Sequence, residues 1–135
     1  MAVVEVLRSD EGALEPRNPV TRSLSGLTVR WSLAEAPDGV EVALADYVAD
    51  TSHARFTGKE GLRFKTWRMR AGEWFEGCYV FVDEAARAAF QAEFSAVAAE
   101  SPGSQIIGSA PILIEECEVV AVAEGGDGFA AAARY

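Results

Sequence analysis

Side chains that could bind or activate a small molecule are concentrated in one segment, residues 61–83, which reads GLRFKTWRMRAGEWFEGCYVFVD. Lys65, Trp67 and Tyr79 can each donate a hydrogen bond to an oxygen anion, through an ammonium, an indole N–H and a phenol hydroxyl. The segment therefore indicates a site that could bind a negatively charged oxygen, with Trp67 and Tyr79 as candidate catalytic residues and Lys65 as a candidate substrate-binding residue.

His53 is the third catalytic candidate and the single histidine of the chain. Because imidazole titrates near neutral pH, it could act as a general base in the cell. Its position near a predicted helix end also suits an ordinary exposed residue. Further candidate substrate contacts are Tyr47, Phe64 and Cys78.

Several of these residues also have an ordinary structural explanation. Trp67 is equally typical of an aromatic side chain buried at a dimer interface. Lys65 could pair with Glu76, its expected diagonal neighbour on the next strand, instead of with a substrate. Cys78 and Cys117 are most simply two buried free thiols, with a disulfide or a catalytic thiol as the alternatives.

The sequence predicts neither a metal site nor a nucleotide cofactor. A structural zinc site needs about four Cys or His ligands, whereas this chain has two cysteines, one histidine and no CxxC pair. It contains no P-loop or GxGxxG phosphate-binding motif and no GxSxG nucleophile motif. We therefore expect chemistry that depends on neither a metal nor a nucleotide.

Composition restricts the classes of partner. The 135 residues suit a single domain, and the net charge of −9 argues against binding to nucleic acid or to an anionic membrane surface. No apolar run reaches the roughly 20 residues of a spanning helix. The first residues, MAVVEVLRSDEG, lack the pattern of a signal peptide. We expect a cytoplasmic protein.

Hydrophobic periodicity predicts six elements between residues 25 and 123. Residues 27–33 alternate as a half-buried strand, and Asp38 with Glu41 resembles the capping box of a helix whose buried stripe runs to Thr51. A strand hairpin follows, then a helix capped by Asp83, and strand-rich sequence over 106–122. The order strand, helix, strand, strand, helix, strand predicts an α+β fold, a ferredoxin-like βαββαβ sandwich.

Residues outside this domain are expected to be peripheral. Residues 1–24 contain two prolines and scattered charges, which favour an N-terminal extension. Residues 124–135 start with a glycine-rich stretch and are expected to form a loose C-terminal tail or a short docked helix.

Hairpin register decides which candidates share a surface. A two-residue turn at Ala71-Gly72 would place Trp67 opposite Glu76 and Lys65 opposite Cys78. Tyr79 would then lie on the other surface of the sheet from Trp67. This register predicts that one surface lines a pocket and the other faces a partner.

The stretch GLRFKTWRMRAGEWFEGCYVFVDEAARAAF is similar to a segment of a small bacterial monooxygenase-like family in the dimeric α/β-barrel superfamily. Gly61, Lys65 and Trp67 match the Gly, Lys-x-Trp pattern of the first family strand. The matching residues of the second strand and the following helix cap are Gly77, Tyr79, Phe81 and Asp83. The order of elements from about residue 27 to residue 122 also fits the family.

The resemblance implies a homodimer whose two sheets pack face to face into a dimeric α/β barrel, with a cavity in each subunit between sheet and helices. It also implies a cofactor-independent monooxygenase acting on a small aromatic or polyketide-like substrate. The alternatives are a non-catalytic homodimeric protein that binds an apolar small molecule, and a lactone isomerase or cyclase that uses His53 with Tyr47 or Cys78.

Overall fold

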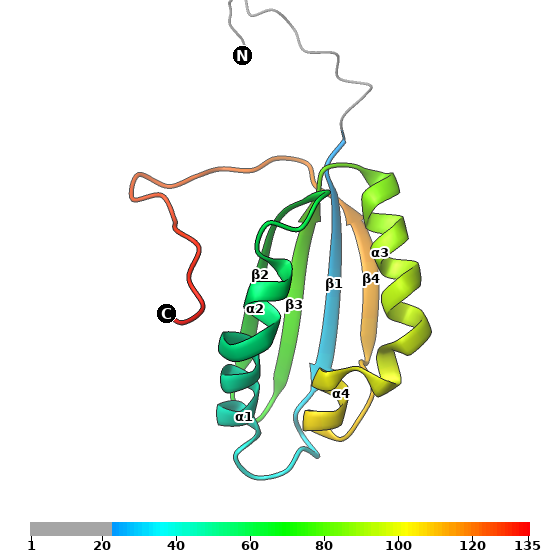
Figure 1. Cartoon of the computed structure of the whole chain (residues 1–135), viewed down its shortest axis with the longest axis vertical. Helices are drawn as coiled ribbons and strands as arrows, with labels where there is room; N and C mark the ends of the chain where they lie inside the picture. The colour runs from blue at the N-terminus through cyan, green and yellow to red at the C-terminus, as the bar shows by residue number, and fades with distance from the viewer. Residues whose placement is uncertain (1–22) are drawn as a thin grey trace, which may run out of the picture.

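The computed structural model describes residues 23–135, and the chain folds into a mixed α+β domain built on a four-stranded antiparallel sheet (Figure 1). The strand order across the sheet is β2-β3-β1-β4. The strands are β1 (Ser25–Ser32), β2 (Leu62–Arg70), β3 (Trp74–Phe81) and β4 (Leu113–Glu118). The α-helices are α1 (Val40–Tyr47), α2 (His53–Phe56), α3 (Glu84–Val97) and α4 (Pro102–Ile107). This order agrees with a ferredoxin-like arrangement.

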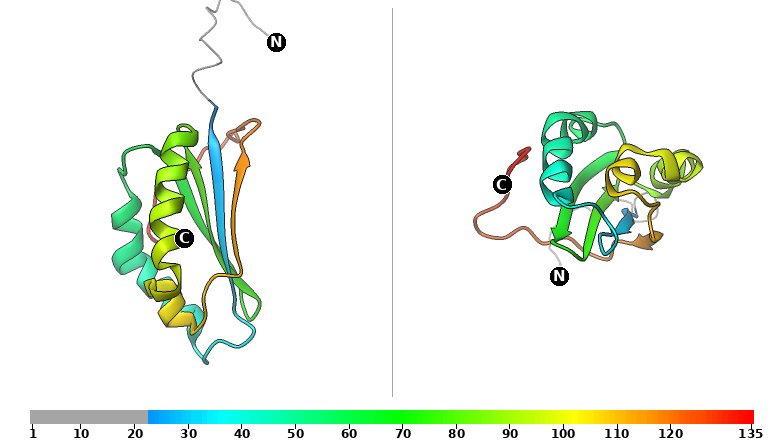
Figure 2. Two further views of the ribbon diagram at one scale, coloured as in Figure 1. Left: turned by 90° about the vertical axis from the view of Figure 1, so that its right-hand side faces the viewer. Right: turned by 90° about the horizontal axis from the view of Figure 1, so that it is seen from below.

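Within residues 23–135, the helices cover one face of the sheet and no helix covers the other, as the edge-on view in Figure 2 shows. We call these the helix face and the open face. On the helix face, Leu27, Val29 and Trp31 of β1 are buried, as the predicted alternation requires. They pack with Leu44 from α1 and Phe81 from β3 in a single hydrophobic core.

The first helical segment differs from its prediction at its N-terminal end. Its N-cap is Gly39, whose φ of 81° is a left-handed conformation that favours glycine, and no side chain caps the helix. Glu41 does not complete a capping box with Asp38; its carboxylate accepts a hydrogen bond of 2.8 Å from the backbone N–H of Gly72. The predicted capping box is therefore wrong, and Glu41 instead fastens α1 to the β2–β3 turn.

A π-helical segment (Val48–Ser52) joins α1 to α2. Its wider turn changes the helical phase, so Ser52 is buried after Val48 and the predicted stripe residue Thr51 is exposed. The helix continues to Phe56, which is also buried. The prediction of a helix up to this point is correct in extent, but its buried face is wrong after residue 48.

The β2–β3 turn contains three residues instead of two, and this corrects the predicted register. Arg70 pairs with Trp74, so Trp67 lies opposite Gly77 and Lys65 lies opposite Tyr79. Glu73 belongs to the turn, where its N–H bonds to the carbonyl of Arg70. A one-residue shift exchanges the faces of one strand relative to the other.

After the hairpin, the start of α3 agrees with its prediction, whereas the segment that follows α3 does not. Asp83 caps α3 as predicted, accepting a hydrogen bond of 2.9 Å from the N–H of Ala86. Ser101 and Pro102 do not simply end this helix, because they begin α4, with Ser101 as its N-cap. The predicted strand over 106–122 is correspondingly shorter, and only β4 forms.

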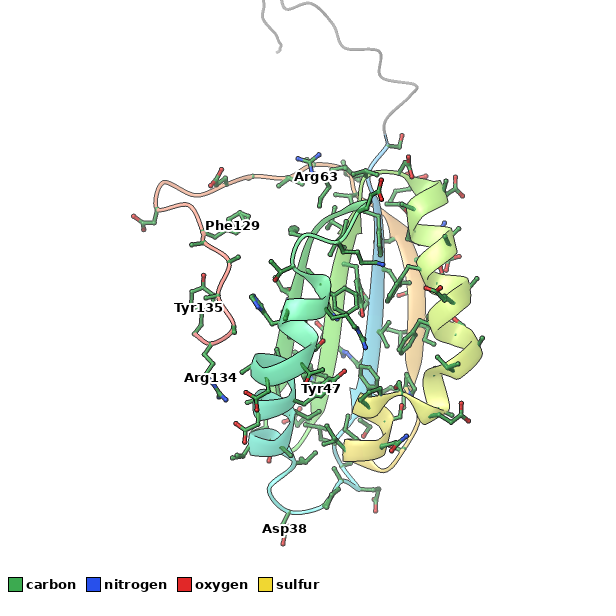
Figure 3. The ribbon with its side chains drawn as sticks, in the orientation of Figure 1. Asp38, Tyr47, Arg63, Phe129, Arg134 and Tyr135 are labelled. Carbon is green, nitrogen blue, oxygen red and sulfur yellow. The ribbon has the colours of Figure 1, made fainter. Side chains whose placement is uncertain are left out.

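The C-terminal segment after β4 has no helix or strand within the described residues. It crosses to the β2 side of the molecule and turns back beside α1, with Phe129 and Arg134 labelled in Figure 3. The rings of Phe129 and Phe64 lie 6.2 Å apart, and Arg134 forms an ion pair of 2.9 Å with Asp46. The predicted short docked helix is not found, and most of the predicted extension 1–24 lies outside the described residues.

Across residues 23–135, none of the helices combines the length and the apolarity that a membrane crossing would require.

Candidate functional site

A cavity of about 320 Å³ lies on the helix face of the sheet, between α2, α3 and the strands. Its volume is at the lower end of the range for small-molecule sites. Eight of its lining residues are aromatic, and they come from the strands β1–β3 and the helices α1–α3: Trp31, Tyr47, Phe56, Trp67, Phe75, Tyr79, Phe90 and Phe94. Arg55 and Glu93 are exposed side chains in the same wall.

Lys65 is the polar group that reaches farthest into this aromatic wall. Its Nζ atom lies 3.7 Å from the ring centroid of Phe56 and 4.4 Å from those of Trp67 and Tyr79. The three rings come from α2, β2 and β3 and surround the amino group on several sides. Among residues 23–135, no carboxylate forms an ion pair with it.

Burial, with a smaller contribution from the nearby charge of Arg55, lowers the pKa of Lys65 from 10.5 to about 6, although Cys78 opposes the shift. The ring faces favour the ammonium form, but they do not replace the hydration that the cation would lose. At neutral pH the side chain is therefore mainly a neutral amine, which has a free electron pair.

Gly77 makes the room that Lys65 occupies. A Cβ atom at this position would lie 3.1 Å from Cε of Lys65 and 3.4 Å from the hydroxyl oxygen of Tyr79. The amine and the phenol hydroxyl thus approach the same point on β3. Burial raises the pKa of Tyr79, and Arg55 opposes that shift only in part, so this hydroxyl keeps its proton and can donate a hydrogen bond.

The corrected register brings together residues that the predicted register separated. Trp67 and Tyr79 lie on the same face and both line the cavity, with Lys65 between them. Tyr47 of α1 also lines it (Figure 3). Four of the seven candidate residues therefore meet at one site.

The remaining three candidates do not line this cavity. Phe64 and Cys78 lie on the open face, where Phe64 pairs with Val80 and Cys78 with Thr66. Of the two pairs considered for an isomerase or cyclase, His53 with Cys78 is therefore divided between the two faces of the sheet, because His53 lies beside Trp67 on the helix face.

His53 is half-buried at the start of α2, with its ring 5.9 Å from that of Trp67. Its Nδ1 atom lies 3.4 Å from the hydroxyl of Thr57. It is not one of the residues that form the cavity wall. Lys65 lines the cavity and His53 does not, so Lys65 is the better placed of the two to act as a base there.

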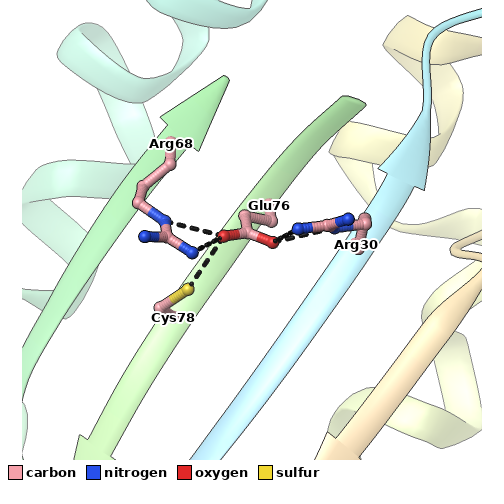
Figure 4. A network of polar contacts seen from close by, with 4 residues as sticks. All are labelled: Arg30, Arg68, Glu76 and Cys78. Carbon is pink, nitrogen blue, oxygen red and sulfur yellow. Dashed lines mark hydrogen bonds and ion pairs between the residues drawn. The ribbon is translucent and has the colours of Figure 1, made fainter. Parts of the chain in front are cut away.

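The open face has its own buried ionisable group, Glu76, which does not pair with Lys65 as predicted. Its carboxylate is fully buried and accepts hydrogen bonds of 2.9 Å from Nε of Arg30 and 2.7 Å from Nε of Arg68 (Figure 4). Burial alone would raise the pKa of Glu76, but the hydrogen bonds from the two arginines outweigh it and lower the pKa. Glu76 is therefore a paired carboxylate in the middle of the sheet.

Cys78 belongs to the same network, because its thiol lies 3.3 Å from a carboxylate oxygen of Glu76. Burial raises the pKa of Cys78, and the carboxylate adds to the shift, so the thiol form is favoured. A thiol nucleophile needs a lowered pKa, and Cys78 has the opposite environment.

Some cavity residues could not be selected from the sequence. Arg55 and Phe56 reach the cavity only because the π-helical segment rotates α2, and the periodicity of a regular α-helix does not indicate this. Phe90 and Phe94 belong to the helix predicted after Asp83, but they were not predicted as binding-site residues. Gly77 was noted only as part of a family pattern, although its lack of a side chain is what admits Lys65.

Within residues 23–135, no group of three or more His, Cys, Asp or Glu side chains is placed to hold a metal ion. No protein-family model matches the chain, and no curated protein does. The crystal structure of NE2512, a protein of unknown function from Nitrosomonas europaea, is similar at a TM-score of 0.53 and 28% sequence identity, over 78% of this chain and 96% of that one. The comparison supports the fold and supplies no activity.

Proposed function

We propose that this protein is a monooxygenase-like enzyme that binds a small phenolic molecule in the cavity and oxidises it with molecular oxygen, without metal or flavin. The observation that carries the proposal is the amino group of Lys65 within a wall of aromatic rings. The rings suit a flat apolar ligand, and the amine suits an acidic hydroxyl on that ligand. The family resemblance of the hairpin supports the same chemistry.

The first step is transfer of the phenol proton to Lys65. A phenol has a pKa near 10, so an amine whose conjugate acid has a pKa of about 6 is a weak base for it. The ammonium and phenolate that result attract each other strongly in a cavity with little water, and Arg55 adds a second positive charge. This attraction offsets much of the difference in pKa.

The second step is reaction of the electron-rich phenolate with oxygen. Electrons pass from the ring to O₂, a carbon–oxygen bond forms, and loss of water from the resulting hydroperoxide gives a quinone. One phenol and one O₂ are consumed for each quinone and water produced. Tyr79 and Trp67 act as hydrogen-bond donors to the oxygens that become negative in these steps.

Oxygen uptake with polycyclic phenols such as naphthols tests the proposal. We expect uptake equal to quinone formation and unchanged by a metal chelator. Lys65→Met should lower the rate by roughly a hundredfold or more, as expected for loss of a general base. The matched control is Arg63→Met, because Arg63 is an exposed cation on the same strand that does not line the cavity, and this variant should keep most of the activity.

His53→Ala separates the two candidate bases. Because His53 lies outside the cavity wall, we expect the variant to retain activity within a few-fold of the wild type. A large loss with His53→Ala and none with Lys65→Met would assign the base to the histidine instead.

Binding without catalysis is the second candidate function, and the fully protonated hydroxyl of Tyr79 beside aromatic rings favours it. In that case naphthols would protect the protein against thermal unfolding, but no oxygen would be consumed. Absence of both protection and oxygen uptake would contradict the phenol site itself.

The resemblance further leads us to propose a homodimer that forms through the open face. No helix covers this face, and it carries half-buried apolar side chains, including Phe64, Trp74 and Val80. Thr66→Glu places a charge at an exposed position of the face and should yield monomers in light scattering. Val42→Glu, on an exposed helical position, is the control that should leave the association unchanged.

A further inference from the structure

The surroundings of Lys65 leave its nitrogen with few competing contacts. Its amino group touches the faces of three aromatic rings, and faces of rings offer no strong hydrogen-bond acceptor. The charged and titratable groups that face it are Arg55 from α2 and Tyr79 from β3, with Lys59 and Glu93 elsewhere in the cavity wall. The nitrogen is therefore open to a ligand that enters the cavity.

We propose that Lys65 is a nucleophile that captures small aromatic aldehydes as a Schiff base inside this cavity. This activity is separate from the oxygenation of phenols, because it uses the electron pair of the amine to form a covalent bond to carbon. Lysines in apolar pockets beside another cation are suited to this chemistry. The aromatic wall selects an aldehyde whose carbonyl is attached to a flat ring.

The covalent steps balance with groups already in the cavity. The nitrogen of Lys65 attacks the carbonyl carbon while the carbonyl π electrons move to oxygen, and a proton moves from nitrogen to oxygen to give a carbinolamine. Loss of that hydroxyl with a second proton releases water and leaves a carbon–nitrogen double bond. Tyr79, which holds its proton and approaches the same point as Lys65, can donate a hydrogen bond to the oxygen as it becomes negative.

The fraction of free amine supports this assignment. Near neutral pH, a lysine with a pKa of about 6 is mostly neutral, whereas an ordinary lysine near 10.4 carries on the order of a thousandfold less of the neutral form. A lower pKa also weakens the nucleophile, and the enclosed site slows entry of the aldehyde. We therefore expect Lys65 to be labelled in preference to an ordinary lysine such as Lys59 by a factor well below a thousand.

The chain offers an internal control, because Lys59 and Lys65 are its two lysines. The wild-type protein is incubated near neutral pH with benzaldehyde and cyanoborohydride, which reduces an imine to a stable benzyl amine. Peptide mapping by mass spectrometry then compares the two lysines and the amino terminus within the same molecules. We expect at least ten times more benzyl label on Lys65 than on Lys59.

Two further measurements test the reason for that preference. Labelling of Lys65 should increase as the pH rises through about 6 and then level off. Lys65→Arg should lose the selective label, while Lys59→Arg should keep it. Equal labelling of Lys59 and Lys65, or no label on Lys65, would overturn the proposal, and so would a label on Lys65 that survives in the urea-unfolded protein at the same excess.

Benzaldehyde has no acidic hydroxyl, so the outcome is independent of the oxygen-uptake experiment. Selective labelling without phenol oxidation would support the nucleophile alone. Phenol oxidation without labelling would leave the proposed function standing and remove this inference.

Discussion

Each face of the hairpin carries one buried ionisable group, and the surroundings favour the charged form of one group and the neutral form of the other. On the open face, Glu76 lies between Arg30 and Arg68, and these hydrogen bonds keep it charged. On the helix face, Lys65 lies among aromatic rings and forms no ion pair with a carboxylate of residues 23–135, and burial favours its neutral form. Two groups on opposite faces of the same hairpin thus differ because the described part of the chain supplies charged partners to one of them and aromatic rings to the other.

The comparison indicates which face is built for stability and which for chemistry. A paired charge satisfies its own hydrogen-bonding capacity and gains little from a ligand. A neutral amine in an apolar wall costs stability but is ready to accept a proton or attack a carbon. This contrast is the reason that the proposed chemistry is placed at Lys65, whereas Glu76 is interpreted as a structural residue.

Glu76→Gln should give the largest change in stability. It leaves Arg30 and Arg68 without their carboxylate, and breaking a buried ion pair costs about 3–5 kcal/mol. Because Arg68 is 57% exposed, we expect a value near the lower limit, measured by urea unfolding. Glu73→Gln is the control, because its ion pair with Arg70 is exposed on both sides and should contribute under about 1 kcal/mol. Equal effects of the two substitutions would contradict the structural assignment of Glu76.

Lys65→Met should increase the stability of the folded protein, whereas Glu76→Gln should decrease it. The unfolded chain binds a proton at this position below pH 10.5, while the folded protein binds it only below about 6, so wild-type stability rises with pH between these values. Removing the amine should stabilise the protein by on the order of 2 kcal/mol near neutral pH. The difference should be largest below about pH 6 and disappear above about 10.5. A variant less stable than the wild type at neutral pH would show that Lys65 is held as an ammonium.

Gly77→Ala, on the helix face, should change the stability by less than the two substitutions above. The added methyl group would approach Cε of Lys65 to 3.1 Å, and the flexible lysine can move away, so we expect about 1 kcal/mol of destabilisation. Displacement toward solvent should raise the pKa of Lys65, which the pH dependence of benzaldehyde labelling would detect. Gly125→Ala, where nothing lies within 4 Å, is the control. An unchanged pH profile in Gly77→Ala would mean that the amine does not depend on the space at Gly77.

Arg134→Ala should have the smallest effect. Its ion pair with Asp46 is more than half exposed on both sides, and exposed pairs contribute under about 0.5 kcal/mol in most cases. Thermal unfolding should therefore show almost no shift. A loss similar to that of Glu76→Gln would show that the C-terminal segment is an integral part of the domain.

The sequence predicted the order of the elements because hydrophobic periodicity depends on short-range spacing. It also predicted the Asp83 cap, which depends on one side chain and one nearby N–H. It did not predict α4, because Ser101-Pro102-Gly103 has the composition of both a helix end and a helix start. The isoleucines at 106 and 107 then favoured a strand, although Ile107 is buried in a short helix.

The candidate site depended on a feature that the sequence leaves open, the length of the β2–β3 turn. Ala71, Gly72 and Glu73 are compatible with a two-residue or a three-residue turn, and the difference moves Tyr79 from one face to the other. Lys65, Trp67, Tyr79 and Tyr47 all line the cavity, and their functional roles stay predictions. Their assignment to opposite surfaces was wrong because register is a long-range property of the pair of strands.

The π-helical segment at Val48–Ser52 has a consequence for how readily this cavity could be remodelled by insertion or deletion. A π turn holds one residue more than the α-helical turn it replaces, so deleting one residue there would restore a regular helix with both of its ends still attached. Because the wider turn accommodates that residue locally, the residues after the deletion would keep their direction, and Arg55 and Phe56 would still lie beside the cavity. The chain could therefore lose one codon in this segment while the wall beside the amine, the sheet and the core remained intact.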